Sequence, residues 1–215
     1  MTRLITVLLI AVASQLIPHL VFAQATAINT YAGYSFEDAI RYQGVPLEYD
    51  ATIEGGFIWG AGFEYVPYRS SYGIELLYLN QSSNAIPNSS SNDSLVSEFE
   101  VKINYGLVGT NAYFSMNRSR TFYSFAGAML GLSFINSKSK ATSSSESSTN
   151  FAWGLRLGTR FKPSDNISLN FTAQLLSTTQ DVSKDSYLSS QYNSEGSASI
   201  IQFGLLGGVS YIFGN

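Results

Sequence analysis

The sequence contains no cysteine, a single histidine (His19) and few charged residues for a chain of 215 residues. Without cysteine, a disulfide framework, a thiolate metal site and a thiol nucleophile are all excluded. Charged types make up 13% of the chain, against about 25% in a typical soluble domain. Apolar types reach 45% and aromatic types 14%, and there are 18 glycines. This composition favours β structure in a nonpolar solvent.

The first residues have the parts of a secretory signal peptide. Arg3 supplies a positive start, and the apolar run of ten residues at 4–13 is too short to span a bilayer. Small residues at the −3 and −1 positions predict cleavage after residue 23 or residue 25. We therefore expect a cleaved segment of 1–23 (or 1–25), followed by a single domain over 24–215. An uncleaved anchor is the alternative interpretation.

The rest of the chain alternates between apolar and polar or small residues with a period of two, which is typical of strands. In residues 151–161 the bulky apolar side chains share one parity, while Arg156 and Arg160 share the other with small residues. The pattern recurs along the chain, so we expect eight strands. They lie at 28–36, 53–65, 72–80, 99–107, 122–134, 151–161, 167–175 and 201–213.

The connections between these segments alternate in length. Three are short and contain Pro, Asn, Asp or Ser, as turns do: 66–71, 115–120 and 162–166. Four are longer, polar and rich in Ser and Asn: 37–51, 81–98, 137–150 and 178–197. An even number of strands, with short turns at one end and long loops at the other, is typical of barrels that cross a membrane. The sequence therefore predicts an all-β, eight-stranded antiparallel up-and-down transmembrane β-barrel.

A barrel in lipid has its apolar side chains outside and its charges inside. Seven charged residues within the expected strands all have the parity opposite to the bulky apolar set. We expect them to form two ionic layers in a lumen that side chains fill. The layer near the short turns contains Glu64, Glu75, Arg156 and Arg160, and the layer nearer the loops contains Glu54, Glu100 and Lys102. Buried charges left without partners cost several kcal/mol, so we expect them to be paired.

Aromatic side chains are expected to mark the two interfaces between membrane and water. The belt near the short turns would contain Tyr65, Tyr72, Tyr113, Phe122, Phe161, Tyr211 and Phe213. The belt near the loops would contain Phe36, Phe99, Phe134 and Phe151.

Other chemistries are less well supported. We expect no enzyme, because a chain that has lost His19 offers no imidazole base to activate a serine. We expect no cofactor and no metal site, and the acidic pairs at 37–38 and 48–50 are interpreted as solvated loop. The formal net charge of −3 makes nucleic acid an unexpected partner. A Gly-x-x-x-Gly spacing at Gly204 and Gly208 could mark a helix, but the alternation around it favours a strand.

Taken together, the signal peptide, the eight alternating strands and a last strand that ends in Tyr211 and Phe213 resemble a known family. The chain is similar to small Gram-negative outer-membrane barrels of the OmpX/OmpA transmembrane-domain type, the porin-like outer membrane protein β-barrel domain. The resemblance implies a place in the bacterial outer membrane, contact with its lipid and lipopolysaccharide, and assembly by the barrel-assembly machinery. We expect a monomer.

Three functions remain open from the sequence. The first is a structural or surface-interaction protein with a polar, filled interior that presents long Ser/Asn-rich extracellular loops. The second is a porin-like passive channel or a transporter of small hydrophobic molecules, since Leu77, Leu79, Phe125 and Met129 are expected to point inward. The third is a soluble ligand-binding barrel, which would require apolar residues inside and charges outside.

Overall fold

The computed structural model describes residues 23–43, 50–67, 70–87, 99–115, 121–139, 145–182 and 196–213. Strands account for nearly all of these ranges: β1 (Ala23–Ser35), β2 (Asp38–Gln43), β3 (Asp50–Ile53), β4 (Gly56–Pro67), β5 (Tyr72–Pro87), β6 (Phe99–Ser115), β7 (Phe122–Ser139), β8 (Ser145–Phe161), β9 (Ile167–Val182) and β10 (Gly196–Phe213). Within these ranges the chain has no helix of the length and apolar character needed to cross a membrane.

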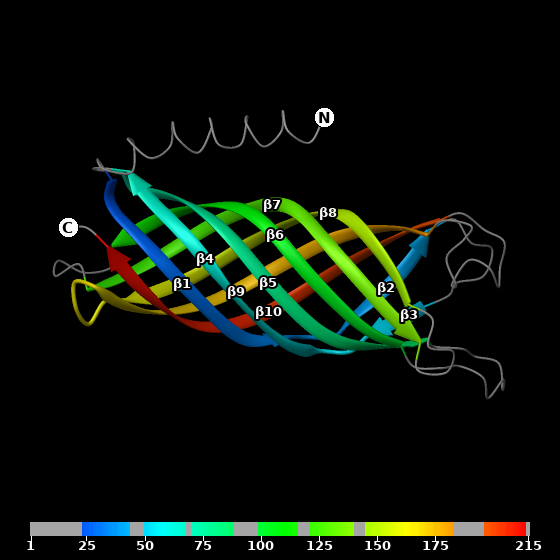
Figure 1. Ribbon diagram of the computed structural model, residues 1–215. Coiled ribbons are helices and arrows are strands. Elements are labelled where there is room, and N and C mark those ends of the chain that lie inside the picture. Colours follow the sequence, from blue (N-terminus) through cyan, green and yellow to red (C-terminus); the bar gives the residue numbers. More distant parts are fainter. Residues whose placement is uncertain are drawn as a thin grey trace, which may run out of the picture.

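The eight long strands form a closed antiparallel barrel (Figure 1). Their order around the wall is β1, β4, β5, β6, β7, β8, β9 and β10, and the pairing of β1 with β10 closes the ring. The predicted eight-stranded up-and-down barrel is therefore confirmed. Most strands are longer than the alternation indicated, and β6 continues to Ser115 rather than ending at residue 107.

The first long connection was predicted to be a loop over 37–51, and this prediction is wrong. It contains β2 and the start of β3, which pair with each other in the same register as β1 and β4. β2 also pairs with β10, and β3 with β5. The β2–β3 hairpin therefore extends the barrel wall at this end of the molecule, after a break at residues 36–37 and 54–55. We call this end the loop end, and the opposite end, where residues 162–166 join β8 to β9, the turn end.

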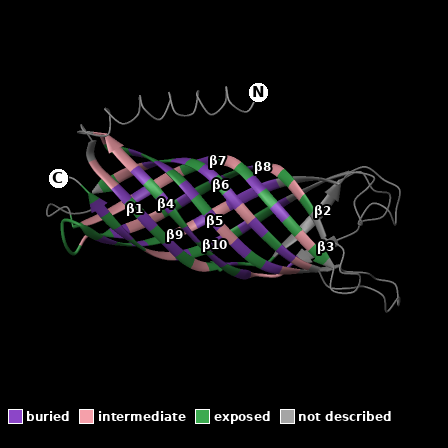
Figure 2. Ribbon diagram, in the orientation of Figure 1, coloured by how far each residue is buried: buried purple, intermediate pink, exposed green. Residues whose placement is uncertain are grey.

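Side chains alternate between the inside and the outside of the barrel along every long strand (Figure 2). Leu155 and Leu157 of β8 and Leu205 of β10 project outward and are about half exposed or more, because no other part of the described barrel covers them. Arg156, between the two β8 leucines, is buried inside. This is the reverse of what a water-soluble barrel requires.

The loop half of β6 runs against the predicted orientation. Val101, Ile103 and Tyr105 were expected to face outward, but all three are buried in the barrel. Lys102 and Asn104, between them, point outward. The prediction was wrong because the alternation of this strand shows only that its two faces differ. It does not show which face meets the interior when the interior itself is apolar at that level.

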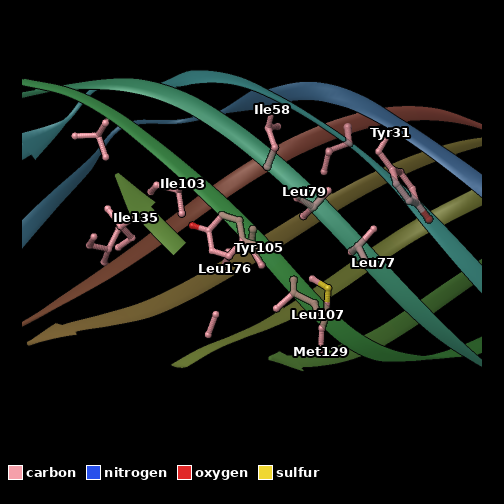
Figure 3. Packing of buried hydrophobic residues seen from close by; sticks show 14 of the residues in the cluster. Tyr31, Ile58, Leu77, Leu79, Ile103, Tyr105, Leu107, Met129, Ile135 and Leu176 are labelled. Carbon is pink, nitrogen blue, oxygen red and sulfur yellow. The ribbon is translucent and has the colours of Figure 1, made fainter. Parts of the chain in front are cut away.

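Apolar side chains fill the loop half of the barrel interior, largely from β4, β5, β6 and β7 (Figure 3). Ile58, Leu79, Ile103 and Tyr105 are almost completely buried in this cluster. Leu77 and Met129 lie at the edge of the cluster nearer the turn end. Both were expected to point inward, and both are buried. The interior is thus polar in its turn half and mainly apolar in its loop half, where the polar side chains of Gln81, Ser133, Thr178 and Gln202 are also buried.

Candidate functional site: the interior polar cluster

The turn half of the interior is organised around two carboxylates. Glu64 of β4 and Glu75 of β5 lie directly opposite each other in the strand register and are both fully buried. Each forms an ion pair with a different arginine of β8. Arg160 Nη2 lies 2.9 Å from Glu64 Oε2, and Arg156 Nη2 pairs with Glu75 Oε2. Two adjacent buried carboxylates would repel each other strongly, and here each of them faces the positive charge of its own guanidinium group.

Two asparagines join the ion pairs into one network. Asn29 Nδ2 donates to Glu75 Oε1 at 2.7 Å and to Glu64 Oε2 at 3.4 Å. Asn111 Nδ2 donates to Glu64 Oε1 at 2.9 Å and to Glu75 Oε2 at 3.3 Å. The Oδ1 atom of Asn111 accepts a hydrogen bond from Arg156 Nε at 2.9 Å. Each amide therefore touches both carboxylates, so that neither ion pair can move without disturbing the other.

Aromatic and polar side chains complete the contacts around this network. Tyr31 donates to Glu75 Oε1 at 2.8 Å, and Tyr113 donates to Glu64 Oε1. Arg160 Nε donates to Asn170 Oδ1 at 2.9 Å, and its Cζ atom lies 5.1 Å from the centre of the Tyr113 ring. The guanidinium group of Arg160 therefore has hydrogen-bond partners along its edge and an aromatic ring against its face.

The resulting interior polar cluster takes residues from all eight strands of the barrel wall. Phe125 joins it through Arg156, whose Cζ lies 5.8 Å from the ring centre, and Ser210 joins it through Asn170 at 2.5 Å. Its members are Asn29 and Tyr31 (β1), Glu64 (β4), Glu75 (β5), Asn111 and Tyr113 (β6), Phe125 (β7), Arg156 and Arg160 (β8), Asn170 (β9) and Ser210 (β10).

Two glycines make room for the carboxylates. A Cβ atom on Gly62 would collide with the carboxylate of Glu75, and one on Gly73 would come within 2.7 Å of Glu64 Oε1. Both glycines point inward, on the strands that carry these glutamates. Because these two positions carry no side chain, the Glu75 carboxylate can lie over Gly62 and the Glu64 carboxylate can lie over Gly73.

The structure brings together four of the seven charged residues that we expected inside, namely Glu64, Glu75, Arg156 and Arg160. The second predicted layer is wrong. Lys102 Nζ pairs with Glu100 Oε1 at 3.1 Å on the outward face of β6, because the parity of that strand is opposite to the one expected. Glu54 lies in the break between β3 and β4, where its Oε2 accepts a hydrogen bond from Asn84 Nδ2 at 3.2 Å.

The asparagines of the cluster were not among the predicted site residues, although two of them carried a signal. Asn29 and Asn170 have the inward parity in their strands, as the alternation indicated. Asn111 lies beyond the predicted end of its strand. In the structure β6 continues to Ser115, and Asn111 points inward while Val108 and Phe114 point outward. Asn111 shares its parity with Ile103 and Tyr105, so it could be placed inside only once the orientation of β6 was known.

Most of the predicted belt residues are on the outside. At the turn end Tyr72, Phe161, Tyr211 and Phe213 are exposed, and at the loop end Phe36, Phe134 and Phe151 are exposed. Tyr65 and Phe122 are half-buried. Tyr113 is a correction, since its hydroxyl and ring belong to the interior polar cluster. The side chain of Phe99 lies outside the described part of the structure.

Within the described ranges, no group of three or more His, Asp or Glu side chains is arranged to hold a metal ion. The carboxylates of the cluster are turned toward arginine and asparagine and away from solvent. What this arrangement can do chemically is to bind the eight strands together and to close the lumen. The predicted signal peptide falls largely on residues outside the described ranges, and its cleavage site stays a prediction.

Comparisons with known proteins agree with this geometry. The family model for the outer membrane protein beta-barrel domain matches residues 5–213. The fold is similar to that of Neisserial surface protein A, with 12% identity, a TM-score of 0.54, and coverage of 88% of this chain and 97% of that one. It is also similar to the outer membrane protein OprG from Pseudomonas aeruginosa, with 13% identity, a TM-score of 0.58, and coverage of 90% and 97%. No curated protein matches the chain.

Proposed function

Because the chain belongs to the outer membrane protein β-barrel domain family and is located in the bacterial outer membrane, we propose that it works as a sealed barrel. In this proposal it is a structural and surface-interaction protein that presents its long Ser/Asn-rich loops to the cell exterior. The observation that supports the proposal best is the interior polar cluster, in which side chains from every strand of the wall meet across the lumen.

The energetics of the cluster favour a permanently closed state. Opening a path through it would separate Arg160 from Glu64 or Arg156 from Glu75, which are buried pairs. Removing one partner of such a pair typically costs about 3–5 kcal/mol, because the other charge is left without compensation. On the loop side of the cluster, the apolar side chains that fill most of the interior disfavour a hydrated route for ions.

The surface role is argued from the length and composition of the loops. The segments at 88–98, 140–144 and 183–195 lie outside the described residues, and Ser and Asn are frequent in their sequence. In barrels of this kind the long connections face the exterior. We also propose that the protein is a monomer in the membrane, because a closed barrel has no free strand edge to pair with another copy.

Conductance in planar lipid bilayers tests the proposal. The refolded chain without its signal peptide is expected to show no steady single-channel openings. Arg160→Ala is expected to leak or flicker, because it opens one side of the cluster. Heat-dependent migration on a gel verifies that each sample is a folded barrel. Steady openings of the wild-type protein, of reproducible size, would contradict the sealed-barrel proposal.

One set of observations favours a second candidate function, the transport of small hydrophobic molecules. The loop half of the interior is mainly apolar, and it contains two buried amides, Gln81 and Gln202, whose side chains have no hydrogen-bond partner among the described residues. A small molecule with an apolar body and one polar group would match such surroundings. The test is uptake of the fluorophore N-phenyl-1-naphthylamine into proteoliposomes. The sealed barrel predicts the rate seen with lipid alone, whereas transport predicts a faster rate that Leu79→Trp reduces.

The proposal assigns no catalytic step to the protein. Glu64 and Glu75, the carboxylates best placed to act as a pair, are each held by an arginine and two amides. A general acid or base must reach the proton that it transfers. Groups that are buried and fully engaged in this way do not meet that requirement.

A further inference from the structure

Two glutamines of the loop half carry amide groups without partners. Gln81 of β5 and Gln202 of β10 both point inward and are almost completely buried. Their Nε2 and Oε1 atoms are shielded from solvent, and all four lack a hydrogen-bond partner among the described residues. Leaving buried amides unpaired destabilises a fold, and a leucine of similar size would avoid that loss. The two amides therefore call for an explanation other than packing.

Gln81 and Gln202 lie at the same height in the barrel. Rows of register partners are tilted, and the row that leaves β5 at Ser82 passes around the ring and returns to β5 at Tyr72, ten residues nearer the turn end. A row therefore descends by about four residues over the three steps from β5 to β10. The row of Gln81 reaches β10 at Leu206, and Gln202 is four residues from Leu206 toward the loop end. The two side chains thus project into one layer of the interior.

Both glutamines lie beside the break that separates β1 and β4 from the β2–β3 hairpin. In β10, Gln202 lies between the residues that pair with β1 and the residues that pair with β2. In β5, the pairing with β4 ends at Ser82, directly after Gln81, and the pairing with β3 begins only at Ala85. The two amides are thus placed where the ladder of hydrogen bonds between strands is interrupted. A wall parts locally at lower cost where fewer backbone hydrogen bonds hold it.

Other polar groups of the loop half are engaged with one another. The hydroxyl oxygens of Ser133 and Thr178 lie 2.5 Å apart and share a hydrogen bond. The hydroxyl of Ser83, two residues after Gln81, donates to the backbone oxygen of Glu54. These pairings leave the hydrogen-bonding capacity of Gln81 and Gln202 for a molecule that is not part of the chain.

The charges around the two amides favour an uncharged molecule. Among the described residues, the buried cationic side chains are Arg156 and Arg160, and both belong to the interior polar cluster of the turn half. The carboxylate of Glu54, in the break, accepts a hydrogen bond from Asn84 and is partly buried. A carboxylate ligand in this layer would therefore meet an acid and no buried cation, and burying an unpaired charge is costly.

We propose that Gln81 and Gln202 form a binding site for a small uncharged amphiphile whose polar group both donates and accepts hydrogen bonds, as a primary carboxamide does. The polar group is held between the two amides, each of which offers a donor and an acceptor. The apolar body packs against Ile58, the register partner of Gln81, and Leu176, the register partner of Gln202. The proposal rests on the same amides as the second candidate function and deepens it, but it requires neither transport nor a conducting lumen.

The test is nuclear magnetic resonance of the ¹⁵N-labelled mature chain in lipid nanodiscs, titrated with octanamide, octane or octanoate. The side-chain amide signals of Gln81 and Gln202 are assigned by their loss in Gln81→Leu and Gln202→Leu. Octanamide is expected to shift both sets of signals saturably, and octane and octanoate are expected to bind about tenfold more weakly. The side-chain amide of Asn136, which points outward on β7, is the reference in the same spectra for amphiphile that has only entered the lipid.

The double variant Gln81→Leu/Gln202→Leu separates a binding role from a structural one. It is expected to lose the saturable binding of octanamide, and without ligand it should unfold at a higher urea concentration than the wild type, because the unpaired amides are gone. Octanamide should raise the urea midpoint of the wild type and leave that of the double variant unchanged. The matched control is Asn136→Leu, which should bind octanamide as the wild type does.

Three results would overturn the proposal. The first is equal binding of octanamide and octane by the wild type, a comparison that holds even if the double variant fails to fold. The second is saturable binding of octanamide that the double variant retains. The third is the absence of any shift at Gln81 and Gln202 with all three probes, which would assign the amides to bound water. Dye uptake at the rate of lipid alone would contradict transport and leave this site standing, and steady conductance would contradict only the sealed barrel.

Discussion

Glu64 and Glu75 face each other across neighbouring strands inside the barrel, and each is paired with a different arginine of β8. The two arginines are four residues apart and therefore both point inward. The ion pairs connect opposite parts of the barrel wall, because β6 and β7 lie between β5 and β8 around the ring. The ion pairs thus act as struts across the lumen and not as local pairs within the sheet.

We expect Arg160→Ala to destabilise the barrel by about 3–5 kcal/mol, because it leaves the buried Glu64 carboxylate without its cation. Urea unfolding of the refolded protein in lipid vesicles measures this difference. The double variant Arg160→Ala/Glu64→Gln should recover part of the loss, since it removes the uncompensated charge. A double variant that is less stable than Arg160→Ala would show that the charge of Glu64 is not what destabilises the single variant.

Asn111→Ala is expected to cost about 1–3 kcal/mol, because it removes hydrogen bonds to Glu64, Glu75 and Arg156 from a buried site. The control is Asn136→Ala on the outside of β7, which should change the unfolding free energy by less than about 0.5 kcal/mol. The same urea titration serves both variants. Equal effects at the two asparagines would show that Asn111 does not connect the ion pairs.

Gly62→Ala and Gly106→Ala form a matched pair for the crowding inside the wall. A Cβ atom at Gly62 meets the Glu75 carboxylate, which Arg156, Asn29 and Tyr31 hold in place. We expect that substitution to cost about 1–3 kcal/mol. A Cβ atom at Gly106 has open space, so that substitution should be neutral or slightly stabilising. A neutral Gly62→Ala would mean that the carboxylate can move.

Leu157→Arg tests the lipid-facing surface. Leu157 is 64% exposed and lies in β8 between the exposed rings of Phe151 and Phe161. An arginine near the bilayer midplane of a barrel costs about 2–4 kcal/mol, and the cost falls to about 0–1 kcal/mol at the interfaces. Thr149→Arg, outward on the same strand at the loop end, is therefore the control. Similar losses at both positions would place the membrane boundary elsewhere.

The orientation of β6 can be checked by single-cysteine labelling, since the natural chain contains no cysteine. Lys102→Cys is expected to react rapidly with a water-soluble maleimide, because residue 102 points outward near the loop end. Ile103→Cys should react slowly, because Ile103 is fully buried among apolar side chains. Faster labelling at residue 103 than at residue 102 would restore the orientation that the alternation alone had suggested.

Much of the architecture could be predicted from the chain before folding. Period-two alternation identified every strand of the closed barrel, and the inward parity of Arg156 and Arg160 agreed with that of Glu64 and Glu75. This works because a lipid exterior and a polar interior demand opposite side chains at successive residues. Alternation did not predict the strands of the first long connection, because β2 and β3 contain too few residues to show a period of two.

The orientation of β6 and the partners within the cluster were decided by tertiary structure. Alternation is a local property, and it distinguishes two faces without naming the interior one. The packing of Ile103 and Tyr105 against other strands settles that choice on β6. The pairing of Arg156 with Glu75 and of Arg160 with Glu64 depends on the register of strands far apart in the chain, because the partners are separated by 81 and 96 positions in the sequence. The residue types thus specified a barrel with charges inside, while closure of the ring, by bringing β1 and β10 together, determined which charges meet.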